Sequence, residues 1–281
     1  MTFRLATVDG RATLVRGDDL HDLERCSGGD LGPDPMAAVA AHRRLHEIAH
    51  GLDGCEVTGH LAGATLGPPV PHPTNVFAIG LNYRSHAAET GMALDGTPPA
   101  PLVFTKFPSC ISEPRTDIVL EADSVDYEVE LVVVIGTGGK DIAEDDAWDH
   151  VAGVTIGQDI SDRTLQFAAK PPHFDLGKSR DTYGPIGPVL VSPDCFDDPD
   201  DITLSCDVNG DRRQHASTTD MILPVPALIA YLSSILTLRP GDLIFTGTPA
   251  GVAMSTGDFL VPGDVITSTI EGIGTLINRC V

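Results

Sequence analysis

Basic residues are scarce in this sequence. Its 281 residues include 18 Lys and Arg against 40 Asp and Glu, which gives a formal net charge of −22 at pH 7. A surface of that sign repels nucleic acid and anionic membranes, because both bind proteins through neutralising Lys and Arg. We therefore expect no nucleic-acid partner and no membrane partner, and an anionic substrate would need a local cation, from a metal or a side chain.

A long hydrophobic run is also missing. The most apolar stretch, residues 221–238, contains two prolines, so it predicts a buried loop and an amphipathic helix rather than a membrane span. The first fifteen residues alternate as a strand does and lack the apolar segment of a signal peptide. These features predict a cytoplasmic protein.

The cysteines show neither a CxxC pair nor the spacing of a zinc site. We therefore expect six free thiols in a reducing cytoplasm, several of them packed as small hydrophobic side chains. Their positions are Cys26, Cys55, Cys110, Cys195, Cys206 and Cys280.

Aromatic residues make up only 5% of the chain, whereas 29 glycines and 22 prolines favour many short strands and turns. Helical segments are few, at 83–91, 144–149, 162–168 and 225–236. We predict that residues 1–70 form a small α+β domain of their own and that the proline-rich segment 67–75 is the linker. Residues 71–281 are rich in strand-like runs. We predict an α+β fold that is mostly β.

Residues 125–131, VDYEVEL, place a carboxylate at every second position of a strand-like run. Side chains alternate across a strand, so Asp126, Glu128 and Glu130 share one face. Two interpretations fit this pattern: the face is exposed to solvent, which screens the repulsion, or a divalent cation lies among the carboxylates.

Other stretches contain side chains that can carry chemistry. His86 and Glu89 are three residues apart and would share a face of a short helix, although such pairs are common on exposed helices. Asp159 ends a strand, where it could cap a turn or supply a further oxygen ligand. Lys178 lies in a Gly/Pro-rich loop and could be an ordinary surface charge. Residues 246–249, TGTP, could offer hydroxyl and N–H groups to a carboxylate, or form only a tight turn.

The order and spacing of these stretches resemble the fumarylacetoacetate hydrolase superfamily. The resemblance rests on NYRSHAAETG, DYEVELVVVIG, GQDISDRTLQ, KSRDTYGPIGP, VNGDRRQ and PGDLIFTGTPAGV, and it runs from about residue 72 to 280. It implies a mixed β-sandwich or β-roll catalytic domain with few helices, and a homodimer. The sequence is most similar to short bacterial members that include acylpyruvate hydrolases, oxaloacetate decarboxylases and hydroxyheptadienedioate isomerases.

The resemblance also implies roles for individual residues. It implies three carboxylate ligands for Mg²⁺ or Mn²⁺, an active-site lysine, a catalytic dyad on a short lid helix, and three residues that line the substrate pocket. In this chain the metal ligands would be Glu128, Glu130 and Asp159, and the active-site lysine would be Lys178. The dyad would be His86 and Glu89, and the pocket residues would be Arg163, Gln166 and Thr248. Asp126 would then begin the strand or contact one of the ligand residues without binding the metal itself.

A site of three carboxylates suits Mg²⁺ or Mn²⁺ and is poor for Zn²⁺. A small anionic 2-oxo acid could chelate such a cation. The resemblance implies hydrolysis of a carbon–carbon bond in a β-diketo acid of the acylpyruvate type, with release of pyruvate, and this chemistry agrees with it. Decarboxylation of oxaloacetate or isomerisation of a hydroxydienedioate is the alternative. The sequence departs from the family at Arg180, which could admit a second negative group or face solvent, and at Ala253, which could stiffen its loop.

Overall fold

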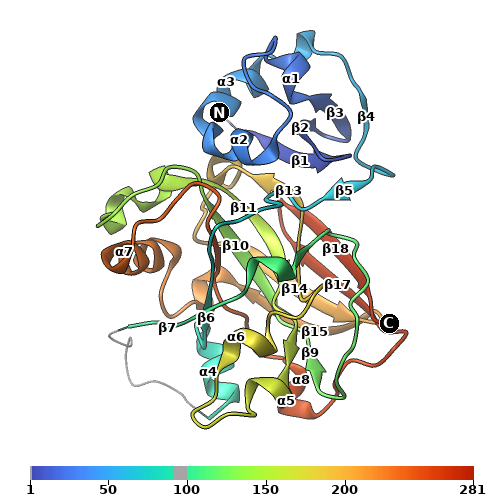
Figure 1. Cartoon of the computed structure of the whole chain (residues 1–281), viewed down its shortest axis with the longest axis vertical. Helices are drawn as coiled ribbons and strands as arrows, with labels where there is room; N and C mark the ends of the chain where they lie inside the picture. Colours follow the sequence, from blue (N-terminus) through green and yellow to red (C-terminus); the bar gives the residue numbers. More distant parts are fainter. Residues whose placement is uncertain (1, 92–99) are drawn as a thin grey trace.

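The computed structural model describes residues 2–91 and 100–281 (Figure 1). Its main feature is one large mixed sheet, whose strands come from residues between Arg4 and Phe245. The strands of its main path, in spatial order, are β4 (Gly59–His60), β3 (Asp19–Asp22), β2 (Arg11–Arg16), β1 (Arg4–Val8), β13 (Gly184–Val191), β11 (Val151–Gln158), β10 (Val129–Ile135), β16 (Leu243–Phe245), β6 (Val76–Gly80) and β7 (Leu102–Thr105).

Two further strands join this sheet off its main path, β5 (Leu66–Gly67) on β1 and β8 (Ile111–Ser112) on β13. Most neighbours are antiparallel, whereas β16 runs parallel to β6 and β8 runs parallel to β13. A four-stranded antiparallel sheet contains β15 (Asp211–Ser217), β14 (Thr203–Val208), β17 (Val265–Ile270) and β18 (Gly274–Arg279). The short strands β9 (Val125–Asp126) and β12 (Ser161–Asp162) pair with each other.

Strand β10 is buried on both faces, which explains its unbroken apolar run VVVI. Leu131, Val133 and Ile135 belong to the core that also contains residues of the four-stranded sheet and of helix α7 (Val225–Ile235). Val132 and Val134 belong to a second core, shared with the N-terminal elements. The alternation of side chains along one strand thus joins the two cores of the protein.

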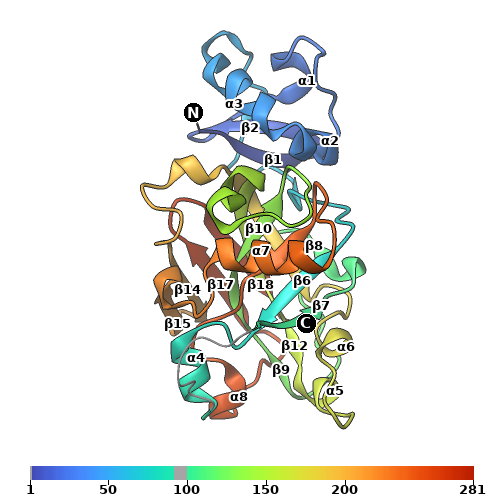
Figure 2. The ribbon, with the colours of Figure 1, turned by 90° about the vertical axis from the view of Figure 1, so that its left-hand side faces the viewer.

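The helices of the described residues are short. They are α1 (Leu23–Cys26), α2 (Pro35–Ala40), α3 (His42–His50), α4 (Arg84–Glu89), α5 (Arg163–Gln166), α6 (Phe174–Gly177), α7 and α8 (Ala253–Thr256), and residues Glu144–His150 form a 3₁₀ helix. Figures 1 and 2 show α4, α5, α6 and α8 gathered at the end of the molecule opposite the N-terminal elements. The predicted mostly β fold with few helices is confirmed.

The N-terminal residues join the large sheet through β1, whose Leu5 pairs with Leu190 of β13. Residues 1–70 therefore do not have a sheet separate from the rest of the chain, and their independence as a folding domain stays a prediction. No helix among the described residues is long and apolar enough to cross a membrane.

The prediction of six free thiols is wrong for one pair. Cys26 and Cys55 form a disulfide, with their Cα atoms 5.5 Å apart. Pairing of β3 with β4, in which Leu20 lies opposite Gly59, brings the two segments together although 29 residues separate them. A separation of that length has no recognisable pattern in the sequence, so the pairing could not be anticipated.

Candidate active site

Three carboxylates converge at the centre of the sheet. Glu128 lies in the break between β9 and β10, Glu130 lies in β10, and Asp159 follows β11 directly. One oxygen of each lies within 4.8 Å of the others, and all three residues are buried. The antiparallel pairing of β10 with β11 produces this convergence, because the N–H of Asp159 donates to the carbonyl of Glu128 at 2.9 Å. The interpretation of VDYEVEL as a solvent-facing strand is therefore wrong.

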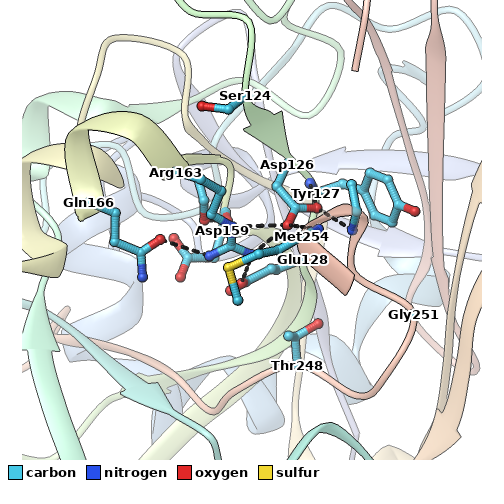
Figure 3. A network of polar contacts seen from close by, with 12 residues as sticks. Ser124, Asp126, Tyr127, Glu128, Asp159, Arg163, Gln166, Thr248, Gly251 and Met254 are labelled. Carbon is cyan, nitrogen blue, oxygen red and sulfur yellow. Dashed lines mark hydrogen bonds and ion pairs between the residues drawn. The ribbon is translucent and has the colours of Figure 1, made fainter. Parts of the chain in front are cut away.

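Two cationic side chains bind Glu128, one at each of its carboxylate oxygens. Nζ of Lys178, at the end of α6, donates to Oε2 of Glu128 at 2.7 Å and to Oδ2 of Asp159 at 2.6 Å. Nη2 of Arg163 donates to Oε1 of Glu128 at 2.5 Å (Figure 3). Burial opposes ionisation of Glu128, but the charges of Lys178 and Arg163 outweigh it and hold its pKa below the ordinary value. Glu128 is therefore ionised at neutral pH.

Lys106 is a part of the site that the sequence analysis missed. It is fully buried just after β7, and its Nζ donates to Oδ1 of Asp159 at 2.7 Å and to the carbonyl groups of Lys178 and Tyr183. Burial alone would lower the pKa of Lys106, but the charge of Asp159 raises it above the ordinary value. A lysine within the apolar run PLVFTKF was the available signal, because lysine is almost never fully buried without a partner.

Glu130 differs from the other two carboxylates. Its Oε2 accepts the N–H of Gly247 at 2.8 Å, and within the described ranges no cationic side chain lies at ion-pair distance. Burial, together with the charges of Asp159 and Glu128, raises the pKa of Glu130 well above its ordinary value. A buried carboxylate without a cationic partner beside two others is costly unless a cation binds there. The donor set is all oxygen and fits Mg²⁺ or Mn²⁺.

The predicted dyad forms on helix α4. Nδ1 of His86 lies 3.1 Å from Oε2 of Glu89, and Oε1 of Glu89 accepts the N–H of Gly251 at 3.0 Å. His86 lines a cavity of about 100 Å³ together with Lys178, Glu128 and Glu130. The structure thus brings the histidine of the dyad, the lysine and two of the carboxylates to one small chamber, whose remaining walls include Ile79, Phe104, Phe167, Phe174 and Met254.

The three residues predicted to bind substrate line this cavity, but their polar groups are already engaged. Arg163 donates to Asp126, Glu128 and Gln166, and the last bond, at 2.8 Å, occupies Oε1 of Gln166. The hydroxyl of Thr248 donates to the carbonyl of Val129 and accepts from Gln214. These contacts fit a role in shaping the walls, and their role in substrate binding stays a prediction.

Arg180 provides no cation for the chamber. Its guanidinium donates to Asp162 at 2.9 and 3.0 Å and also pairs with Glu121, and it does not line the cavity. The suggestion that Arg180 admits a second negative group is therefore not supported. Ala253, the other departure, begins α8, and its backbone N–H donates to Asp126 at 2.7 Å.

A buried carboxylate triad beside a His–Glu dyad, carried on a mixed β fold, is an enzyme-like arrangement that can place a divalent cation and a general base in one site. Residues 75–281 match the model of the family described as fumarylacetoacetate (FAA) hydrolase C-terminal. This chain belongs to that family, as the resemblance of its motifs predicts.

Curated relatives and solved structures agree with this assignment. Oxaloacetate tautomerase YisK of Bacillus subtilis is 45% identical over 226 residues, which cover 78% of this chain and 74% of that protein. The human mitochondrial oxaloacetate tautomerase FAHD2A is 41% identical, with coverage of 76% and 68%. The structure of maleylpyruvate hydrolase from Sphingobium sp. SYK-6, in complex with manganese(II) and pyruvate, has a TM-score of 0.82 at 31% identity, covering 99% of this chain and 98% of that one.

Proposed function

We propose that this protein interconverts the keto and enol forms of a small 2-oxo acid, with oxaloacetate as the first substrate to test. The observation that carries the proposal is that His86, Lys178 and the carboxylates Glu128 and Glu130 line one chamber of about 100 Å³. Pockets for drug-sized ligands are about 300–1,000 Å³, so this chamber favours a substrate of a few carbon atoms. The oxaloacetate tautomerases among the relatives support the same choice.

Glu128, Glu130 and Asp159 would hold a divalent cation, Mg²⁺ or Mn²⁺. When bound, such a cation supplies Lewis-acid polarisation of carboxylate and keto oxygens. In the proposed reaction, the His86 imidazole takes a proton from the carbon beside the keto group, and Glu89 stabilises the imidazolium that forms. Lys178 donates a hydrogen bond to the oxygen on which negative charge develops. The imidazolium of His86 then gives up its proton, directly or through water, to that oxygen, which completes the enol and restores the neutral imidazole.

Hydrolysis of acylpyruvates, the reaction expected from the sequence motifs, is the second candidate. It is favoured by the His86–Glu89 pair, because a base held in this way can also take a proton from water. The resemblance to maleylpyruvate hydrolase supports it as well. Both reactions use the same stabilisation of an enolate, and decarboxylation of oxaloacetate would use it without an attacking water.

The deciding experiment compares the wild-type protein with His86→Ala, and with His60→Ala as the matched control on an exposed histidine. Enol and keto oxaloacetate are followed by absorbance, and pyruvate release is measured from oxaloacetate and from an acylpyruvate panel, with Mg²⁺, Mn²⁺ or EDTA. Tautomerisation that needs both the cation and His86 supports the proposal. Cleavage of acylpyruvates without tautomerisation establishes the second candidate instead. Inactivity toward every substrate rejects both.

A homodimer and a cytoplasmic location remain predictions. Light scattering coupled to size-exclusion chromatography measures the first directly, since the chain has a mass of 29.6 kDa. A mass of one chain in solution would contradict the dimer.

A further inference from the structure

Asp126 lies behind the proposed metal ligands and has more polar contacts than any role as the start of a strand requires. It is completely buried in β9. Its Oδ1 accepts the N–H groups of Tyr127 at 2.8 Å and of Ala253 at 2.7 Å. Its Oδ2 accepts the N–H of Met254 at 2.9 Å and two bonds from Arg163, at 2.9 Å from Nε and 2.7 Å from Nη2.

Arg163 connects Asp126 with the proposed ligand Glu128. The same Nη2 that donates to Asp126 also donates to Oε1 of Glu128, while Nη1 donates to Gln166 (Figure 3). The guanidinium is planar and has its donors in a fixed fork, so its contact with Asp126 determines where Nη2 points. Arg163 is buried, and although burial lowers its pKa, the charges of Glu128 and Asp126 raise it above the ordinary value.

The charges explain why a second carboxylate is useful here. If Glu128 were the only anion beside Arg163, the full charge of the guanidinium would act on Glu128 and would compete with a divalent cation for it. Asp126 shares that charge from the side away from the cavity, since Asp126 does not line the cavity whereas Glu128 does. Glu128 thereby keeps negative charge for a cation and stays fixed in orientation.

We propose that Asp126 is a positioning residue, which acts through Arg163 to orient Glu128 and to preserve its affinity for the divalent cation. This inference rests on the proposed metal site. It assigns Arg163 to the support of a metal ligand, where the sequence motifs indicated a role in lining the substrate pocket. It also explains the close contact of α8 with the site, because the N–H groups of Ala253 and Met254 donate hydrogen bonds to the carboxylate of Asp126.

A double-mutant cycle tests whether Asp126 acts through Arg163. Mn²⁺ affinity is measured by titration calorimetry and by electron paramagnetic resonance of free Mn²⁺, for the wild-type protein, Asp126→Asn, Arg163→Met and the double variant. We expect Asp126→Asn to weaken Mn²⁺ binding by about ten- to a hundredfold, the range for groups that support metal ligands. In the Arg163→Met background we expect the same substitution to have less than about a threefold effect, because the residue through which it acts is missing.

A second variant keeps the test decisive if Asp126→Asn does not fold. Arg163→Lys retains the charge, but one ammonium group cannot reproduce the fork that joins Asp126, Gln166 and Glu128. We expect Arg163→Lys to weaken Mn²⁺ binding within the same range, and a cooperative thermal transition in EDTA shows that the variant is folded. Arg212→Lys, at an exposed arginine, is the control.

The outcomes separate this inference from the proposed function. If Asp126→Asn weakens Mn²⁺ binding equally in both backgrounds, or if neither Asp126→Asn nor Arg163→Lys changes it, the positioning role is wrong while the metal site stands. If the wild-type protein does not bind Mn²⁺, or if Glu130→Gln binds it as well as the wild type, the proposed metal site is wrong and the positioning role is rejected with it.

Discussion

The imidazole of His86 is held by Glu89, whose Oε2 lies 3.1 Å from Nδ1 of the ring. The other carboxylate oxygen accepts the N–H of Gly251, so Glu89 cannot turn away from the histidine without losing a second bond. A carboxylate in this position favours the tautomer with the proton on Nδ1, which leaves Nε2 as the basic nitrogen. The same arrangement lets the negative charge stabilise an imidazolium during turnover.

Glu89→Gln therefore tests the dyad with little change in shape. The amide can still occupy the space of the carboxylate, but it has no charge to stabilise the imidazolium. We expect kcat for the proposed tautomerisation to fall by at most about 10²–10⁴, the usual contribution of a general base such as the His86 that Glu89 supports, while KM changes by only a few-fold. Glu144→Gln, at an exposed glutamate, is the control. An unchanged kcat for Glu89→Gln would show that Glu89 has no part in the chemistry.

Lys106→Met tests the buried pair with Asp159. The substitution leaves Asp159 without its fully buried partner and removes the donor to two carbonyl groups. Breaking a buried ion pair from one side costs about 3–5 kcal/mol, whereas Lys140→Met, at an exposed lysine, should change the free energy of unfolding by no more than about 0.5 kcal/mol. Urea denaturation in EDTA measures both. Equal effects of the two substitutions would contradict a structural role for Lys106.

Much of this site could be predicted because its residues fall within contiguous motifs. Glu128 and Glu130 are two positions apart, and His86 and Glu89 are three apart, so local geometry alone places each pair on one face. Lys106 belongs to no such motif, since 53 residues separate it from Asp159. The same limit applies to Arg163, whose bonds to Asp126 and Glu128 depend on the pairing of β9 with β12. Contacts of that kind follow from tertiary packing and are not visible in residue spacing.

The cysteines provide a test of the fold that is independent of activity. Cys195 is the exposed free thiol among the described residues, whereas Cys110, Cys206 and Cys280 are buried. Burial raises the pKa of Cys206 and of Cys280 to about 12. Fewer thiolates therefore exist at pH 8 in the folded protein than in the unfolded chain. We expect a thiol reagent to label one cysteine of the folded protein, four after unfolding in urea, and all six after reduction. Labelling of six thiols before reduction would contradict the disulfide between Cys26 and Cys55.

The raised thiol pKa values also have a consequence for stability. The folded protein keeps these protons above the ordinary thiol pKa of 9.0, so the unfolded chain binds fewer protons between pH 9.0 and about 12. The free energy of unfolding must then fall as the pH rises through this interval. Urea denaturation at pH 8 and pH 10 measures the change, and Cys206→Ala should reduce it.

Gly251 lies where the loop before α8 meets both Glu89 and the neighbouring strand. Its φ is +106°, and a Cβ atom added there would lie 2.0 Å from the carbonyl oxygen of Arg213. Gly263 has a similar φ of +100°, but its added Cβ would have no heavy atom within 4 Å. The two glycines therefore differ in steric contact and hardly at all in backbone strain, which makes Gly263→Ala a matched control for Gly251→Ala.

Both substitutions should lower the free energy of unfolding by about 1–3 kcal/mol, because alanine disfavours the left-handed backbone. Gly251→Ala should lower it by about a further 1–3 kcal/mol, because a backbone carbonyl cannot rotate away from the new methyl group. Displacement of the loop also removes the N–H of Gly251 from Glu89, so kcat should fall for Gly251→Ala and stay near the wild-type value for Gly263→Ala. Urea denaturation and steady-state kinetics on the same preparations measure both effects. If the two variants lost equal stability and equal activity, the contact of Gly251 with Arg213 would be unimportant, and the loop would not be what holds Glu89 against His86.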